Sequence, residues 1–99
     1  MNARIKNMDL SLLINSVLKL ENYEECQNFF DDLCTVQELK ALSQRIEVAS
    51  MLIDGKVYSE IVKATGASTA TISRVNRSLN YGSDGYKIIF DRLKEDGLL

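Results

Sequence analysis

Small, hydroxyl-bearing and guanidinium side chains gather between Ser68 and Arg77, and no other stretch of the chain is better suited to chemistry. On a helix, at about 100° per residue, the apolar and polar members of this stretch separate onto opposite sides. One side carries Ile72, Val75 and Leu79, and the other carries Ala70, Ser73, Arg74 and Arg77. A helix that enters a major groove needs small side chains near its N-terminus and arginines for guanine edges or phosphates. The pattern therefore favours contact with DNA.

The candidate DNA contacts include residues just before this helix. An ordinary amphipathic helix with a solvated polar face is the alternative, because two arginines alone do not exclude it. The absence of Asp and Glu from Gly66 to Leu79 favours the DNA interpretation. The predicted DNA-binding residues are Lys63, Ser68, Thr69, Ala70, Ser73, Arg74 and Arg77.

The element that must position these residues runs from Tyr58 to Leu79 and divides at Gly66 into two short helical patterns. A tight turn between crossed helices usually needs a positive φ, which glycine adopts without strain. Ser68 stands where an N-cap is wanted, so the second helix should begin at about Thr69. The stretch at 58–79 therefore predicts a helix-turn-helix.

The chain offers little for catalysis or metal binding. It contains no His, and Cys26 and Cys34 lack CxxC spacing. No nucleophile with a base, phosphate-binding loop or metal set can be assembled, so we expect no enzyme, no metal and no cofactor. The thiols fit small core residues in a reducing compartment, with an inter-subunit disulfide as the alternative. The acidic residues at 24–32 fit a solvated helix face better than a metal site.

Charge is unevenly distributed although the net charge is only −2. Residues 56–80 contain four basic residues and one acidic residue, whereas residues 9–55 contain three basic and nine acidic residues. The basic part coincides with the predicted helix-turn-helix, as expected if only that surface meets phosphate.

A length of 99 residues predicts one domain spanning 1–99, and an apolar content of 45% is enough for a core. No stretch reaches the roughly 18 apolar residues of a membrane span, and residues 1–7 lack the design of a signal peptide. We therefore expect a cytoplasmic protein without a membrane partner.

The first predicted helix, at 10–20, has too many apolar faces for a simple surface helix. Its large apolar residues are Leu10, Leu12, Leu13, Ile14, Val17, Leu18 and Leu20. Each one left in water forgoes roughly 1.5 to 3 kcal/mol, so we infer a partner, most simply a second copy of the chain. A membrane-surface helix is the alternative, but one lysine in eleven residues supports it poorly.

The remaining helices are marked by their caps. Asp9 is a candidate N-cap for the first helix, and Asn22 and Glu25 are spaced as a capping box for a helix from Tyr23 to about Leu33. A second box at Thr35 and Glu38 opens a long helix to about Ile53 that stops at Gly55. A last helix is expected at 84–95. The fold class is therefore all-α with about six helices, in which residues 10–53 form the dimerisation helices.

Apolar stripes predict the buried side of each of these helices. The second helix carries Tyr23, Cys26, Phe30 and Leu33; the long helix carries Leu39, Leu42, Ile46, Ala49 and Ile53; and the last helix carries Tyr86, Ile89, Phe90 and Leu93. Arg45 lies beside the stripe of the long helix, where a side chain that reaches out to solvent is the plain explanation.

The features from Thr35 to Leu79 also follow a family pattern in their order and spacing. They are the Thr35 and Glu38 box, Ala41, Leu42 and Arg45 on the long helix, Gly55 at its end, then Gly66, Ala67, Ala70, Thr71, Ile72 and Arg74 as GAxxATIxR, and Ser78 and Leu79. This segment, nearly half of the chain, resembles the Trp repressor family, apart from a single-residue gap after Gly55. The chain looks most like the Trp-repressor-like branch whose function has not been worked out, rather than the tryptophan sensor itself.

The resemblance implies an interlocked homodimer whose two recognition helices enter successive major grooves of a palindrome, about 34 Å apart. It also implies a candidate ligand cleft, because the corepressor indole of the family lies between two arginines matched here by Arg45 and Arg74. Thr35 matches a threonine of that pocket. Val75 departs from the pattern, because the tryptophan sensor has a glycine there that leaves room for the ring. We therefore expect DNA binding without tryptophan, either with no corepressor or with another small-molecule effector.

Two functions from different classes remain open at this point. The first is a homodimeric regulator of transcription, expected to be a repressor, that binds double-stranded DNA at a palindromic operator. The second is a protein–protein interaction module that keeps the helix-turn-helix scaffold without DNA reading, which the acidic first half of the chain favours.

Overall fold

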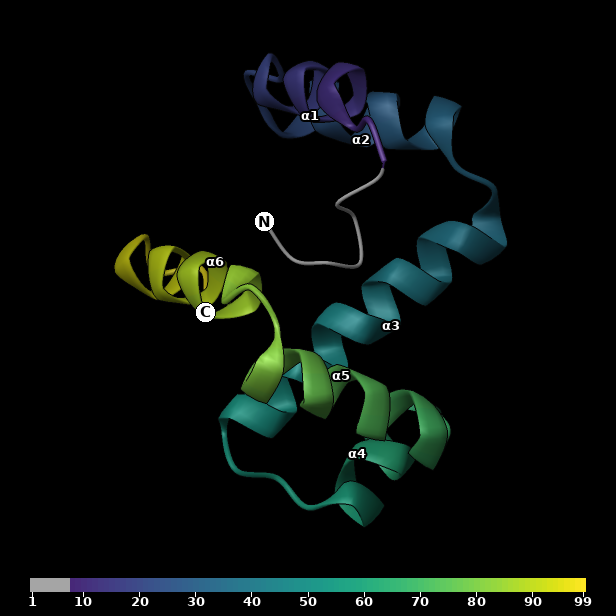
Figure 1. Ribbon diagram of the computed structural model, residues 1–99, viewed down its shortest axis with the longest axis vertical. Helices are drawn as coiled ribbons and strands as arrows, with labels where there is room; N and C mark the ends of the chain where they lie inside the picture. The colour runs from purple at the N-terminus through teal and green to yellow at the C-terminus, as the bar shows by residue number, and fades with distance from the viewer. Residues whose placement is uncertain (1–7) are drawn as a thin grey trace. The chain divides into compact units, whose positions relative to one another are not determined.

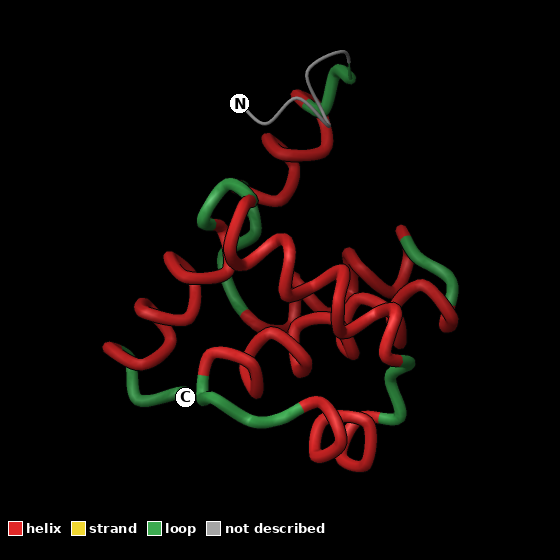
Figure 2. The backbone as a smooth tube through the Cα atoms, turned by 60° about the horizontal axis from the view of Figure 1, so that its bottom comes forward, coloured by secondary structure: helices red, strands yellow, loops and turns green. Residues whose placement is uncertain are grey.

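The computed structural model describes residues 8–99, which form six α-helices and no strand (Figure 1). The helices are α1 (Ser11–Leu18), α2 (Tyr23–Leu33), α3 (Val36–Ile53), α4 (Tyr58–Thr65), α5 (Thr69–Tyr81) and α6 (Gly85–Glu95). Figure 2 shows that only loops connect the helices. The predicted all-α class with about six helices is confirmed. The prediction about a signal peptide at residues 1–7 lies outside the described residues.

The chain divides into two compact units, and the division falls inside α3. One unit ends at Ala41, and the other runs from Leu42 to Leu99. The second unit contains most of α3 and all of α4, α5 and α6, so it holds every predicted DNA-binding residue. The single domain expected for 1–99 stays a prediction.

Helix α1 is shorter than expected and begins at a different cap. Leu10, not Asp9, occupies its N-cap position and makes no side-chain cap hydrogen bond. Asp9 Oδ1 instead accepts the Ser11 N–H at 3.0 Å, and the hydrogen bonds from Ser11 lower the pKa of this carboxyl. Asp9 therefore satisfies one free donor of the first turn from one position further back than a standard cap.

Helix α2 has the predicted bounds but only half of the predicted capping box. Asn22 Oδ1 accepts the Glu25 N–H at 2.9 Å, whereas Glu25 Oε1 accepts the N–H of Glu21, at 3.0 Å, rather than that of Asn22. Within one chain both ends of the predicted apolar stripe are uncovered, because Tyr23 is 83% and Leu33 51% exposed. The two cysteines, Cys26 and Cys34, are free and half-buried rather than core residues.

Helix α3 carries the complete reciprocal box that the sequence predicts. The Thr35 N–H donates to Glu38 Oε1 at 2.9 Å, and the Glu38 N–H donates to Thr35 Oγ1 at 3.1 Å. The hydrogen bond from the Thr35 backbone lowers the pKa of Glu38. At the other end Gly55, at φ 81°, allows its own N–H and that of Lys56 to bond back to the last turn, at 3.0 Å each.

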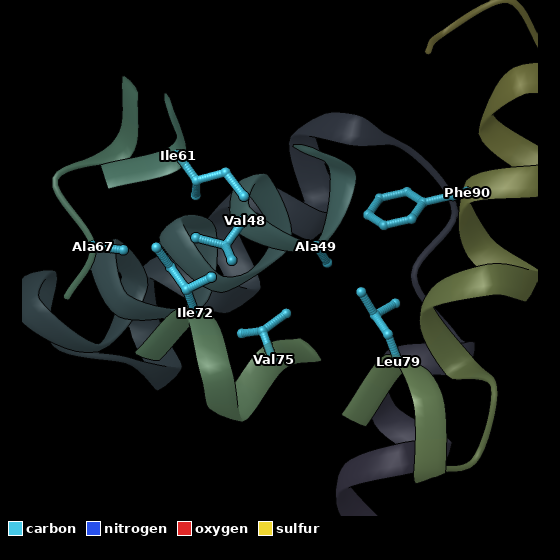
Figure 3. Close-up of a cluster of buried hydrophobic side chains, with 8 residues drawn as sticks. All are labelled: Val48, Ala49, Ile61, Ala67, Ile72, Val75, Leu79 and Phe90. Carbon is cyan, nitrogen blue, oxygen red and sulfur yellow. The ribbon is translucent and has the colours of Figure 1, made fainter. Parts of the chain in front are cut away.

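The core of the second unit is a cluster of eight buried apolar residues (Figure 3). They are Val48, Ala49, Ile61, Ala67, Ile72, Val75, Leu79 and Phe90. α3, α4, α5, α6 and the turn before α5 each supply at least one of them. Four of these residues, Val48, Ala49, Ile61 and Ile72, are 0% exposed. The cluster therefore holds the helix-turn-helix against α3 by apolar packing.

The predicted stripes of α3 and α6 are partly wrong within a single chain. On α3 only Ala49 of the predicted stripe is buried, and Ile46 is 52% exposed. The other buried residue of α3 is Val48, because α3 turns a neighbouring side toward the core. On α6 Phe90 is buried, but Ile89 is 51% exposed, since the core meets only the narrow side of α6 on which Phe90 lies.

Candidate nucleic-acid interface

Helices α4 and α5 pack against each other across a turn centred on Gly66. This glycine follows α4 at φ 72° and ψ 5°, and its N–H donates to the Val62 carbonyl at 2.9 Å. A Cβ at Gly66 would meet no atom within 4 Å. Backbone conformation rather than a close neighbour therefore explains the glycine, and the predicted positive φ at this turn is confirmed.

Ser68 is the N-cap of α5, which begins at Thr69 as predicted. The Ser68 hydroxyl accepts the Thr71 N–H at 3.1 Å and donates to Thr71 Oγ1, also at 3.1 Å. Because this bond engages the hydroxyl proton, the first role of Ser68 is to start the helix and fix its direction. A contact from Ser68 to DNA stays a prediction.

The two sides of α5 separate as the sequence pattern predicts. The apolar residues Ile72, Val75 and Leu79 are 0%, 3% and 7% exposed, respectively. The predicted DNA-binding residues are all exposed. Those on α5 are Thr69, Ala70, Ser73, Arg74 and Arg77, and the other two are Ser68 at its N-cap and Lys63 on α4. The helix therefore presents small, hydroxyl-bearing and cationic side chains to solvent while its other side anchors it in the core.

Sequence reasoning missed the polar contacts that fix the turn to the rest of the second unit. Gln44 Nε2 on α3 donates a hydrogen bond to the Thr65 carbonyl at 3.1 Å. The Thr65 hydroxyl donates to the Ile61 carbonyl at 2.7 Å and accepts the Ala67 N–H at 3.1 Å. Nothing in the sequence separates Gln44 from a solvated glutamine on a helix, because the contact joins residues that are far apart in the chain.

The residues of the candidate ligand cleft have different surroundings. Arg45 on α3 and Arg74 on α5 are both exposed, so both guanidinium groups are free to take up a charged or planar group. Val75 lies in the core cluster. Thr35 uses its hydroxyl to accept the Glu38 N–H at the start of α3. The use of these four residues as a ligand site stays a prediction.

Other kinds of site find no support within residues 8–99. No group of three or more His, Cys, Asp or Glu side chains there is arranged to hold a metal ion. None of the six helices combines the length and the apolar character that a membrane span requires. The surface of α5 and its flanking turn is therefore the strongest candidate site in the described part of the chain.

Comparison with known proteins supports the fold and the resemblance. The model of the family described as Trp repressor protein matches residues 8–94. Uncharacterized protein YerC of Bacillus subtilis (strain 168) is 54% identical over 92 residues, which cover 93% of this chain and 88% of that protein. Two solved structures, a proposed Trp repressor from Staphylococcus aureus and a TrpR-like protein from Eubacterium eligens ATCC 27750, superimpose with TM-scores of 0.90 and 0.86. Both are 50% identical to this chain, and each match covers 94% of this chain and 96% of the other. The chain belongs to the Trp repressor family.

Proposed function

We propose that the protein is a sequence-specific DNA-binding regulator of transcription that acts in the cytoplasm as a homodimer on a palindromic operator. The observation that carries this proposal is the division of α5, whose apolar side is buried behind the Ser68 cap while its small and cationic side is exposed. A helix presented in this way fits a major groove. Membership of the Trp repressor family supports the same function and favours repression.

The charge distribution supports a single DNA-binding surface. Arg74 and Arg77 on α5 and Lys63 on α4 are exposed, and α5 contains no Asp or Glu. The rest of the chain is mostly acidic, with nine acidic and three basic residues in 9–55. Phosphate is therefore attracted to the α4 and α5 surface and repelled by the acidic residues of 9–55, which favours one defined orientation on DNA.

The exposed apolar residues of the single chain support the homodimer. Leu12 and Leu18 of α1 are 83% and 73% exposed, and Leu42 and Ile46 of α3 are 40% and 52% exposed. A monomer rarely leaves this much large apolar surface in water. A second copy of the chain is the simplest partner to cover such residues, because a two-fold interface uses the same surfaces on each subunit.

We further propose that tryptophan does not gate DNA binding. The glycine that leaves room for the indole in the tryptophan sensor is replaced by Val75, which fills the core of the helix-turn-helix with its two methyl groups. Arg45 and Arg74 are exposed and free to bind a different small-molecule effector.

Two measurements on the same purified protein test these proposals. A binding selection on genome fragments should enrich palindromic fragments without any added ligand. Isothermal titration with L-tryptophan should give no heat of binding. A heat of tryptophan binding together with tighter DNA binding would make the protein a tryptophan sensor. If no fragment is enriched either with or without tryptophan, the DNA-binding function is rejected.

A protein-interaction module is the second candidate, and the acidic surface of α2 is what favours it. Glu24, Glu25, Asp31 and Asp32 are all exposed on this helix. Under this alternative, replacing these four residues should abolish binding of a protein partner, whereas replacing Arg74 and Arg77 should not. The DNA-binding proposal predicts that only the arginine changes affect binding of the selected fragments.

A further inference from the structure

We infer that Gln44 is a positioning residue, whose side chain fixes the turn between α4 and α5 to α3 and so sets how α5 is presented to DNA. The inference rests on the proposed function. Gln44 Nε2 donates to the Thr65 carbonyl at 3.1 Å, and the two residues are 21 positions apart in the sequence. Gln44 and Thr65 both lie in the second unit, which contains α4, α5 and the part of α3 from Leu42 onward.

This hydrogen bond differs from the others that side chains make within residues 8–99. Every other one joins residues at most four positions apart, and therefore stays within one helix, cap or turn. The remaining attachment of α4 and α5 to α3 is apolar packing around residues such as Val48 and Ile61. Apolar packing has no preferred direction, whereas a hydrogen bond has a narrow range of lengths and angles. The hydrogen bond of Gln44 therefore restricts the orientation of α4 and α5 relative to α3 more narrowly than apolar packing does.

The acceptor of this bond belongs to a residue, Thr65, that makes two further hydrogen bonds within the helix-turn-helix. The Thr65 carbonyl belongs to the last turn of α4, where carbonyls lack partners within the helix. The Thr65 hydroxyl is bonded to Ile61 on one side and to Ala67 on the other, and both of these residues are buried. Ala67 directly precedes Ser68, the N-cap of α5. A series of hydrogen bonds thus leads from α3 to Ala67, directly before the N-cap of the predicted recognition helix.

The same helix, α3, also carries apolar residues that are exposed in the single chain. Ile46 is two positions from Gln44 and 52% exposed, and Ile53, at the end of α3, is 37% exposed. In the proposed homodimer these residues belong to the surface that the second copy covers. Gln44 therefore relates the recognition helix to the dimer interface, and that relation decides which separation of two half-sites the dimer accepts.

Gln44→Met tests the inference because methionine has a similar length and no N–H donor. Gln37→Met is the matched control, since Gln37 is an exposed residue near the start of the same helix. The full-length protein is measured in two ways. Hydrogen exchange reports the protection of the Gly66 and Ala67 amides, and binding is measured to the selected palindrome and to versions with its half-sites moved closer or further apart by one base pair.

We expect Gln44→Met to raise exchange at Ala67 by about fivefold, as the loss of one typical hydrogen bond implies. We also expect the preference of Gln44→Met for the original half-site spacing over the shifted spacings to fall by a similar factor. Gln37→Met should leave both the exchange and the spacing preference unchanged. Gln44→Glu, which replaces the donor by a carboxylate oxygen facing the Thr65 carbonyl, should change both in the same direction. This second variant keeps the test available if methionine is poorly tolerated.

Unchanged exchange at Ala67 would overturn the inference. Raised exchange with an unchanged spacing preference would overturn the positioning role, since the bond would then only stabilise the turn. The failure of the proposed function has a separate sign, because the wild-type protein would then enrich no palindrome. The exchange measurement would still decide in that case whether Gln44 fixes the turn.

Discussion

Arg74 and Val75 are neighbours on α5, yet Val75 is 3% exposed in the core and Arg74 is exposed to solvent. Figure 3 shows the Val75 side chain among those of the buried cluster. The valine is therefore part of what holds the helix-turn-helix together. The proposed insensitivity to tryptophan rests on this core position of Val75.

Val75→Gly should lower the free energy of unfolding by about 2–4 kcal/mol, because it removes a buried side chain and places glycine inside a helix. Ser73→Gly is the control, since Ser73 is exposed on the same helix and the change costs only about 0.5 kcal/mol of helix propensity. Urea unfolding measures both variants. Equal losses would show that Val75 does not contribute through the core.

Arg77→Ala should weaken binding to the selected palindrome and flatten its salt dependence. If Arg77 neutralises one phosphate, the slope of log affinity against log salt concentration should fall in size by about 0.9 for each recognition helix. Arg92→Ala removes the same charge from an exposed position on α6 and should leave the slope unchanged. Titrations at several salt concentrations decide this, and an unaltered slope in Arg77→Ala rejects the phosphate contact.

Ser68→Ala should reduce the free energy of unfolding by about 1 kcal/mol, because the Thr71 N–H loses the side-chain acceptor that caps α5. Ser59→Ala removes a hydroxyl from an exposed position in α4 and serves as the comparison. Thermal or urea unfolding of the DNA-free protein measures the difference. A Ser68→Ala variant as stable as Ser59→Ala would mean that the cap contributes little.

The contribution of Glu38 to stability should depend on pH. Its hydrogen bond from Thr35 holds the pKa below the ordinary value of 4.5, so the folded state favours the ionised carboxylate. The stabilisation is therefore present above about pH 4.5 and is lost as the pH falls through the lowered pKa of the folded state. The neutral amide of Glu38→Gln does not titrate.

The melting temperature of the wild-type protein should accordingly exceed that of Glu38→Gln near neutral pH, and the two should converge in acid. Circular dichroism melts over this pH range measure the difference. Glu47→Gln removes a carboxylate from an exposed position further along α3 and is the control. A difference between wild type and Glu38→Gln that stays constant with pH would contradict the linkage.

Each feature that the sequence predicted correctly depends on residues close together in the chain. The positive φ at Gly66, the cap at Ser68 and the box between Thr35 and Glu38 each involve residues within four positions. The two sides of α5 follow from the period of the helix alone. These predictions succeed because backbone sterics and short-range hydrogen bonds already limit the conformations of such segments before any packing occurs.

The sequence by itself therefore determined the all-α class, the helix-turn-helix and the exposed set of candidate DNA contacts. Only the tertiary structure decided which apolar residues of α3 and α6 are buried within one chain, namely Val48 rather than Ile46 and Phe90 rather than Ile89. It also joined Gln44 to Thr65. A helix with apolar residues on several faces can turn any of them toward its neighbours, and that choice depends on how distant segments pack, which no local spacing encodes.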